Sequence, residues 1–215
     1  MIQSVTRQLL IGSVALFILL VLSGCATAQA DPAPTGEAYT FHGLQYDPVE
    51  AAPDFELFDH HGQPIRLSDF KGKLVLLYFG FLNCPDACPL TLSTWSVAYR
   101  MLTEENDGND LNSDDLRFVF ITVDPERDSP TLVRKHLDLF NTDFVGLWGT
   151  VDDVEDIARS YNVFMQKVDS ESAAGYLVNH TTLTFVIDQN GQLVLAHQTD
   201  ITPAELTADI KQLLQ

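Results

Sequence analysis

Continuous apolar runs in the middle of the chain predict strands that are covered on both faces. Residues 74–82 (LVLLYFGFL) and residues 116–123 (LRFVFITV) contain few polar side chains. Strands with one solvated face alternate apolar and polar positions, whereas an uninterrupted run is typical of a strand buried on both faces. We therefore expect these two segments to form the middle of a sheet.

Shorter apolar segments separated by turn residues predict two β-hairpins. Gly62 lies in the turn of the first, and Asn190-Gly191 supplies the positive φ angles of a tight turn in the second. The strand segments are residues 55–57 with 65–67 and residues 183–187 with 193–197, and a further short strand is expected at residues 144–148.

Apolar residues at helical spacing predict helices between these strands. The first helix is expected at residues 90–105, with Leu92, Trp95, Tyr99 and Leu102 on one face. Others are expected at residues 131–140 and 152–161, and a last one opens with a capping box from Thr202 to Glu205. This order predicts an α/β sandwich with a central mixed sheet flanked by helices. It matches the order of a thioredoxin-like fold.

The first 24 residues have the pattern of an export signal. Arg7 precedes an apolar run at residues 9–22, which is shorter than the ~20 residues of a membrane-spanning helix. The run ends in Leu22-Ser23-Gly24-Cys25, which resembles the lipobox of bacterial lipoproteins, where cleavage leaves a lipid-carrying cysteine at the new N-terminus. An uncleaved, short membrane anchor is the alternative. Both interpretations place the folded part in the cell envelope, on the extracytoplasmic face of a membrane.

Composition divides the chain into three parts. Residues 1–24 are expected to be the lipoprotein signal peptide, residues 25–50 a lipid-anchored flexible tether with a lead-in, and residues 51–215 a single folded domain. Residues 26–38 (ATAQADPAPTGEA) lack aromatic and large aliphatic side chains and hold two prolines, so they cannot build a core of their own.

The charge of the chain argues against a nucleic-acid partner. The 215 residues include 30 acidic and 12 basic side chains, for a net charge of −18. Removal of residues 1–24 would leave 11 basic side chains and a net charge of −19. Such a surface repels phosphate backbones. The acidic stretch at residues 104–115 is expected to be a solvated loop without a function.

The chemistry of the chain is concentrated in one pair of cysteines. Cys84 and Cys88, in the sequence CPDACP, follow the predicted central strand and precede the first helix. In open α/β sheets functional groups gather at the carboxyl ends of strands. A helix N-terminus also stabilises a thiolate, which is both the nucleophilic and the metal-binding form of cysteine.

Spacing alone leaves redox exchange and metal binding open. The thioredoxin-type motif separates its cysteines by two residues, whereas three separate Cys84 from Cys88. Positions i and i+4 of a regular helix hold Cβ atoms ~5–6 Å apart, farther than a disulfide prefers, although Pro85 and Pro89 can disturb the helix. Thiolates prefer Cu(I), zinc or iron–sulfur clusters, and a structural zinc site needs four ligands. Two cysteines with one histidine suit copper better.

One of the six histidines is placed to complete such a site. His180 lies just before the second predicted hairpin, in the loop that faces the cysteine motif in thioredoxin-like folds and there usually carries a cis-proline. No proline occurs between Pro130 and Pro203. The other histidines are expected to be surface or packing residues, with adventitious metal binding as an alternative for the adjacent pair. They are His42, His60, His61, His136 and His197.

Several separated motifs together resemble the SCO/SenC family of membrane-anchored, thioredoxin-like copper proteins that help to assemble the copper centre of cytochrome c oxidase. The motifs are residues 78–81 (YFGF), 84–89 (CPDACP), 123–130 (VDPERDSP), 176–180 (YLVNH) and 185–188 (FVID). The resemblance implies that Cys84, Cys88 and His180 bind copper, as Cu(I), Cu(II) or both. It leaves residues 124–130 to shape the site or to contact a partner. Leu82-Asn83 and Asn179 depart from the common family pattern, but none of them is a ligand position.

The resulting hypothesis is a membrane-anchored metallochaperone, not an enzyme, that delivers copper to an oxidase subunit or prepares its copper centre. Other periplasmic copper chaperones and thiol reductants are further expected partners. The alternative is a thiol–disulfide oxidoreductase with Cys84 and Cys88 as its catalytic pair, forming a redox disulfide. A thiol peroxidase and a scaffold with a vestigial site are weaker alternatives, since no arginine lies near the cysteine motif in sequence and the ligands are intact.

Overall fold

The computed structural model describes residues 39–103, 112–170 and 175–215 of the chain. Tyr39–Gln215 form one compact unit. The expected signal peptide, Cys25, the tether at residues 26–38 and most of the acidic stretch at residues 104–115 lie outside the described residues. Within the described part, no helix is both long enough and apolar enough to cross a membrane.

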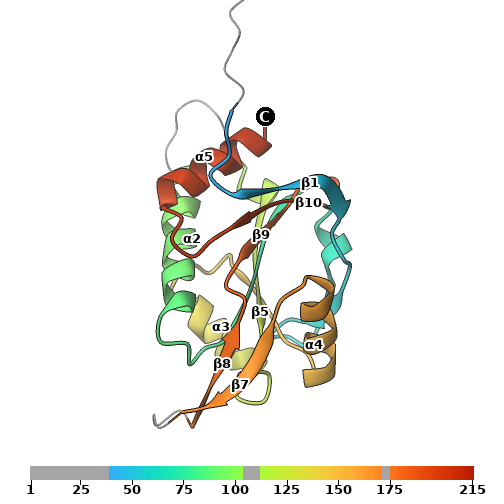
Figure 1. Cartoon of the computed structure of the whole chain (residues 1–215), viewed down its shortest axis with the longest axis vertical. Coiled ribbons are helices and arrows are strands. Elements are labelled where there is room, and N and C mark those ends of the chain that lie inside the picture. The colour runs from blue at the N-terminus through green and yellow to red at the C-terminus, as the bar shows by residue number, and fades with distance from the viewer. Residues whose placement is uncertain (1–38, 104–111, 171–174) are drawn as a thin grey trace, which may run out of the picture. The chain divides into compact units, whose positions relative to one another are not determined.

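A six-stranded mixed sheet forms the centre of the fold (Figure 1). Its strand order is β1-β10-β9-β4-β5-β6. β5 pairs in parallel with β4 and β6, whereas the β4–β9, β9–β10 and β10–β1 pairs are antiparallel. The strands are β1 (Leu44–Ala51), β4 (Leu74–Gly80), β5 (Leu116–Thr122), β6 (Val145–Leu147), β9 (Thr184–Ile187) and β10 (Gln192–His197). The predicted α/β sandwich with a central mixed sheet is therefore confirmed.

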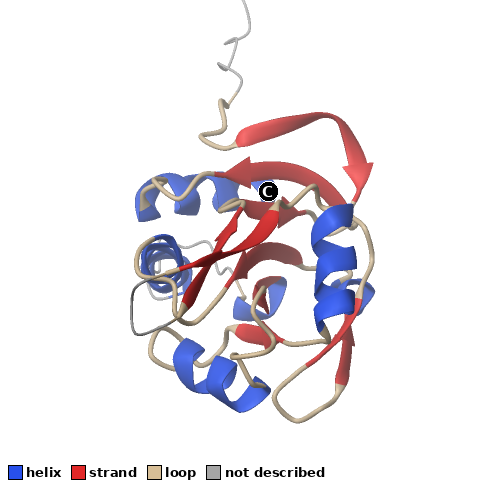
Figure 2. Cartoon of the chain, turned by 60° about the horizontal axis from the view of Figure 1, so that its bottom comes forward, coloured by secondary structure: helices blue, strands red, loops and turns tan. Residues whose placement is uncertain are grey.

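Four α-helices cover this sheet in the part of the chain that the structure describes. They are α2 (Ala87–Thr103), α3 (Pro130–Leu137), α4 (Val151–Ser160) and α5 (Pro203–Leu213). α2 packs against α5, and α4 lies on the opposite side of the sheet from α2 (Figures 1 and 2). Thr202 caps α5 together with Glu205, as predicted, and Ser129 and Thr150 cap α3 and α4. The helices thus begin where side-chain oxygens can accept their free backbone N–H groups.

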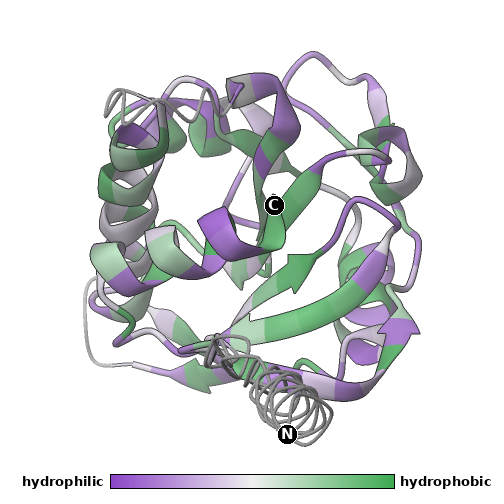
Figure 3. Ribbon diagram, turned by 90° about the horizontal axis from the view of Figure 1, so that it is seen from above, coloured by the Kyte–Doolittle hydropathy of each residue, from purple (hydrophilic) through white to green (hydrophobic). Residues whose placement is uncertain are grey.

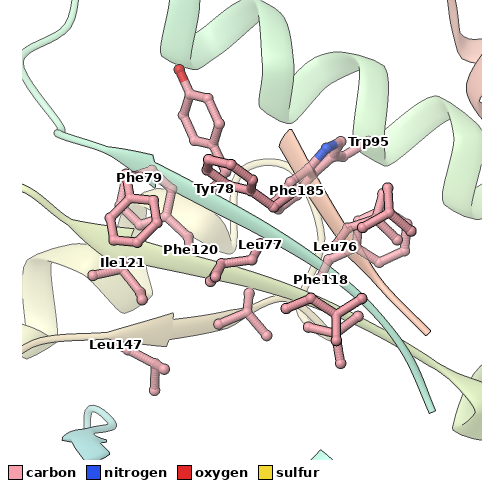
Figure 4. Close-up of a cluster of buried hydrophobic side chains, with 14 of the residues drawn as sticks. Leu76, Leu77, Tyr78, Phe79, Trp95, Phe118, Phe120, Ile121, Leu147 and Phe185 are labelled. Carbon is pink, nitrogen blue, oxygen red and sulfur yellow. The ribbon is translucent and has the colours of Figure 1, made fainter. Parts of the chain in front are cut away.

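Large aromatic side chains fill the space between the sheet and α2 (Figure 4). Every residue of β4 is buried, as the continuous apolar run predicts. The rings of Trp95, Phe118 and Phe144 contact one another at centroid distances of 5.1–5.8 Å. In Figure 3 the central strands are accordingly largely hydrophobic, whereas the helices around them carry both hydrophobic and hydrophilic residues. This core fixes the end of β4, where the cysteine loop begins.

Two smaller sheets lie outside the central one. β2 (Glu56–Phe58) and β3 (Pro64–Arg66) form the first predicted hairpin, with Gly62 at φ 74° in its turn. β7 (Met165–Asp169) and β8 (Tyr176–His180) form a second pair. The prediction that His180 lies in a loop was therefore wrong, because His180 is the last residue of β8. The hairpin lets Tyr176–His180 satisfy their backbone groups without joining the central sheet.

Two other boundaries differ from the sequence prediction. β1 (Leu44–Ala51) pairs with β10, so the folded unit extends N-terminal to residue 51 into the segment that was expected to be a lead-in. One residue of β1 is half-buried and the others are exposed. The sequence therefore lacks the alternation of apolar and polar residues from which a strand could have been predicted. α2 begins at Ala87 instead of residue 90, and this places Cys88 inside its first turn.

Candidate functional site

The two cysteines lie on either side of the point where α2 begins. Cys84 belongs to the loop that leaves β4, and its N–H donates to the carbonyl oxygen of Phe81 at 3.3 Å. Cys88 is the second residue of α2 and is almost completely buried, whereas Cys84 is half-buried. The pair therefore does not span a regular helical turn. One sulfur is accessible and the other lies in the core.

A hydrogen bond network makes the two thiols chemically different. Both are free, and the backbone N–H of Cys88 donates to Sγ of Cys84 at 3.4 Å. The thiol of Cys88 and the backbone N–H groups of Asp86 and Cys88, with a smaller effect from the charge of His180, lower the pKa of Cys84 to about 5 against the opposing effect of burial. The same thiol–thiolate bond, together with burial, raises the pKa of Cys88. Cys84 is thus a thiolate at neutral pH and Cys88 a thiol.

Tyr78 on β4 packs against the buried sulfur. Its hydroxyl lies 3.6 Å from Sγ of Cys88, and Figure 4 shows this hydroxyl directed toward α2. Burial is the main reason that the pKa of Tyr78 is raised, so the hydroxyl stays protonated and donates. Gly80 is next to both: a Cβ there would lie 2.7 Å from the Tyr78 ring and 3.0 Å from Sγ of Cys88. A glycine is required by this close approach.

His180 ends β8 and faces the end of β4, from which the cysteine loop leaves. Its ring lies 6.3 Å from the ring of Tyr78 and 5.6 Å from that of Phe81, edge-on in both cases. Nδ1 is 3.0 Å from the carbonyl oxygen of Val178. Because a carbonyl only accepts, Nδ1 donates to it, and in the neutral ring Nε2 therefore holds the lone pair. Nε2 is buried and has no hydrogen-bond partner among the residues that the structure describes, as expected of a nitrogen that is available to a ligand.

Cys84, Cys88 and His180 are neighbours around Tyr78, but they do not yet form a closed ligand set. In residues 39–103, 112–170 and 175–215, no three His, Cys, Asp or Glu side chains converge closely enough to hold a metal ion. The donor types fit a soft ion: a thiolate, a thiol that can ionise, and an imidazole with a free lone pair. Closure around an ion would require movement of side chains or of the hairpin.

The other five histidines lie elsewhere. His42 and His197 both contact Asp209. His60 and His61 stack on each other in the β2–β3 turn with a centroid distance of 3.8 Å, and His136 packs on Phe140. Their roles as surface or packing residues agree with these positions.

The loop at residues 124–128 contributes residues that the sequence did not assign. Asp124 and Asp128 are fully buried, and Arg127 reaches from this loop to Tyr176 on β8. The sequence motif VDPERDSP indicated the loop but not its contacts, because Arg127 and Tyr176 are 49 residues apart. Tyr78 was also missed as a contact of the site, since it appears in the sequence as one more apolar core position.

Comparison with known proteins assigns the family. The family model described as SCO1/SenC matches residues 45–215, which includes the cysteine loop, residues 124–128 and the His180 hairpin. The chain belongs to the SCO1/SenC family. A relative is the SCO2-like protein of Rickettsia felis, 32% identical over 205 residues that cover 95% of this chain and 92% of the relative.

Solved structures of Sco proteins share the fold. Apo Sco1 of Thermus thermophilus is 36% identical with a TM-score of 0.70, covering 83% of this chain and 99% of that one. Bradyrhizobium japonicum ScoI, solved with copper bound, is 31% identical with a TM-score of 0.67 and covers 76% of this chain and 99% of that one. The thioredoxin-like fold expected for an SCO1/SenC protein is thereby confirmed.

Proposed function

We propose that this SCO1/SenC protein is a copper metallochaperone that binds copper through Cys84, Cys88 and His180. The observation that carries the proposal is a free, half-buried Cys84, whose Sγ accepts from the first turn of α2, together with a buried Nε2 of His180 that has no hydrogen-bond partner among the described residues. Copper in the structure of Bradyrhizobium japonicum ScoI supports it. The metal is the cargo of the protein, and the residues supply two sulfurs and one nitrogen to it.

The two cysteines take different parts in capture. Cys84 is half-buried and ionised, so it is the first sulfur that an incoming Cu(I) ion meets. Cys88 must lose its proton to bind as a thiolate, and binding therefore releases about one proton at neutral pH. His180 offers Nε2 while Val178 holds the proton on Nδ1. The affinity for copper consequently rises with pH until Cys88 no longer needs to be deprotonated.

We further propose that the chain delivers this copper to a subunit of cytochrome c oxidase, or prepares the copper centre of that subunit. Family membership and the position of the more accessible Cys84 sulfur support it. The N-terminal sequence supports attachment to a membrane through a lipid on Cys25. Labelled fatty acid should be incorporated by the wild-type chain and not by a Cys25→Ser variant; equal labelling would remove this part of the proposal.

Copper titration of the reduced full chain in detergent tests the central proposal. Cys84→Ser/Cys88→Ser should abolish stoichiometric Cu(I) binding, and His180→Ala should weaken it. His60→Ala/His61→Ala is the matched control, since it removes an exposed histidine pair outside the site. Normal binding by the double cysteine variant would refute the proposal.

A second function, thiol–disulfide exchange, is favoured by the unequal thiols. The Cys84 thiolate would attack a client disulfide to form a mixed disulfide and release one client thiolate. The Cys88 thiol, on losing its proton, would then displace the second client thiolate and form the Cys84–Cys88 disulfide. The client gains two electrons that the pair loses. This activity should survive His180→Ala, which separates it from copper binding.

A further inference from the structure

The strands β7 and β8, here called the His180 hairpin, have no backbone pairing with the central sheet within the described part of the chain. β7 and β8 form a two-stranded sheet of their own. An isolated two-stranded hairpin is at best marginally stable in water, so side-chain contacts must fix where this one lies. The position of Nε2 relative to the cysteines depends on those contacts.

The first strand residue of β8 is held from several sides by the loop at residues 124–128. The hydroxyl of Tyr176 donates to Oδ1 of Asp124 at 2.7 Å, and Nη1 of Arg127 donates to the carbonyl oxygen of Tyr176 at 2.9 Å. The guanidinium carbon of Arg127 also lies 3.5 Å from the centroid of the Tyr176 ring. A stacked guanidinium with a side-chain and a backbone hydrogen bond defines both the position and the orientation of Tyr176.

Asp124 and Arg127, the two residues that hold Tyr176, are themselves joined by an ion pair. Nε of Arg127 lies 2.5 Å from Oδ2 of Asp124, whose side chain is completely buried. Burial of a carboxylate is costly unless it is paired and hydrogen bonded. Here one carboxylate oxygen bonds Arg127 and the other bonds Tyr176. The pair therefore has little freedom to move without loss of its partners.

The same loop also holds the cysteine side of the site. Oδ2 of Asp128 accepts from the N–H of Leu82 at 3.0 Å and from the hydroxyl of Thr122 at 2.7 Å. Leu82 lies two residues before Cys84. The N–H of Asp128 in turn donates to the carbonyl oxygen of Asp124 at 2.9 Å. One short loop thus joins the cysteine loop to the histidine hairpin.

We propose that Asp124 and Arg127 are positioning residues, which hold β8 through Tyr176 at the place where His180 can join the cysteines in binding copper. The inference rests on the proposed function and concerns residues that are not ligands. A purely structural ion pair would stabilise the fold without affecting the contribution of His180 to the metal. The two possibilities therefore differ in whether loss of these contacts lowers copper affinity only when His180 is present.

A double-mutant cycle between Tyr176→Phe and His180→Ala measures this coupling. Tyr176→Phe removes the hydroxyl bonded to Asp124 and keeps the ring under Arg127. It should lower copper affinity about 10-fold, at the low end of the ~10–100-fold typical of residues that orient metal ligands. In the His180→Ala background the same change should have no further effect. An equal loss in both backgrounds, or no loss in either, would overturn the inference.

Trp148→Phe is the matched control, because it removes a hydrogen bond to the same loop, from Nε1 of Trp148 to the carbonyl oxygen of Pro125, in which β8 takes no part. Its copper affinity should match that of wild type. Arg127→Lys provides a second variant that keeps the charge and loses the planar fork, and it should also weaken binding only when His180 is present. Thermal unfolding of each variant verifies that it is folded.

A measurement without copper separates the inference from the proposed function. In the metal-free chain, Tyr176→Phe should shift the NMR signals of the His180 ring and speed amide exchange in β8, whereas Trp148→Phe should do neither. If wild type binds no copper, the proposed function fails while these signals still report on positioning. Unchanged His180 signals in Tyr176→Phe would overturn the positioning role itself.

Discussion

Oδ2 of Asp209 lies 2.9 Å from Nε2 of His197, and both side chains are completely buried. The same carboxylate accepts hydrogen bonds from the first residues of the folded unit: from the hydroxyl of Tyr39, from the backbone and Nδ1 of His42, and from the backbone of Gly43. One aspartate on α5 therefore joins the beginning of the folded unit to its last helix and to β10 of the central sheet.

Asp209→Asn should destabilise the protein without changing copper binding. The amide keeps one acceptor oxygen but cannot satisfy all five donor groups, and it presents an N–H₂ group to some of them. Loss of a buried, multiply bonded charge costs about 2–4 kcal/mol. Urea unfolding measures this, with the exposed Asp200→Asn as control. Equal stability of the two variants would contradict the prediction.

The pKa values of the two histidines that contact Asp209 should be shifted in opposite directions from the ordinary value of 6.5. The hydrogen bond to Asp209 raises the pKa of His42, so its stabilising effect is complete below 6.5 and is lost as pH rises through the higher, folded-state pKa. Burial lowers the pKa of His197, so its contribution is lost as pH falls below 6.5. NMR titration should show His42 above and His197 below this value. In Asp209→Asn, His42 should return toward 6.5.

Asp128 should make the protein less stable as pH rises from about 4 to 6. Burial raises its pKa to about 6, although hydrogen bonds from Thr122 and Leu82 oppose the shift and the charges of Asp124 and Arg127 act in opposite directions. The folded state therefore holds a proton that the unfolded chain loses near 3.8, and its stabilising effect of about 3 kcal/mol disappears above pH 6.

Asp128→Asn removes this dependence and keeps an oxygen that accepts from Leu82 and Thr122. Denaturant unfolding between pH 4 and 7 should therefore show a smaller slope with pH in the variant. Asp115→Asn, at a half-buried position that borders β5, is a control in the same part of the sequence. If the slopes of wild type and Asp128→Asn coincide, the carboxyl of Asp128 does not titrate in this range.

Cys84 should react with iodoacetamide at pH 6–7 well before Cys88, because its pKa of about 5 makes it a thiolate there while Cys88 remains a buried thiol. Peptide mass spectrometry distinguishes the two sites in a Cys25→Ser background. Cys88→Ala removes the largest cause of the lowered pKa, so absorbance at 240 nm should show Cys84 ionising at higher pH. An unchanged midpoint would show that the helix N-terminus alone lowers the pKa.

Gly80→Ala should disturb the buried sulfur as well as the fold. The added Cβ would lie 2.7 Å from the rings of Tyr78 and Phe120 and 3.0 Å from Sγ of Cys88. Overpacking of this kind costs about 1–3 kcal/mol. Gly146→Ala on β6 is the matched control, because its Cβ would lie 2.6 Å from the side chain of Val133 on α3, away from the cysteines. Both should lose stability, but only Gly80→Ala should change the titration of Cys84.

The central strands and the capped helices could be predicted because their signals are local. β4 is buried at every position and shows it in an uninterrupted apolar run, and Thr202 with Glu205 marks the start of α5 in four residues. β1 is an edge strand with seven of its eight residues exposed, so its pairing with β10 leaves no periodic pattern. β7 has four exposed residues out of five, so it could not be predicted from the sequence for the same reason.

Some residues of the candidate site could likewise be predicted from local sequence, and others could not. Cys84, Cys88 and His180 could be selected from their residue types and from their places relative to predicted strands. The contact of Tyr78 with Cys88, and that of Arg127 with Tyr176, depend on which elements become neighbours in space. The apolar periodicity of the sequence does not contain this information. It indicates which residues are buried or exposed, but not which distant residues they contact.

The segments around His180 meet only late in the making of the chain. Both thiols are synthesised some 90 residues before the imidazole, and β9 and β10 follow it. Closing such long loops is slow compared with forming a helix turn. A partly synthesised chain therefore has both thiols before it has the imidazole of the proposed ligand set. With the proposed ligand set, the ability to bind copper therefore coincides with the end of folding, so copper binding would report whether a molecule is completely folded.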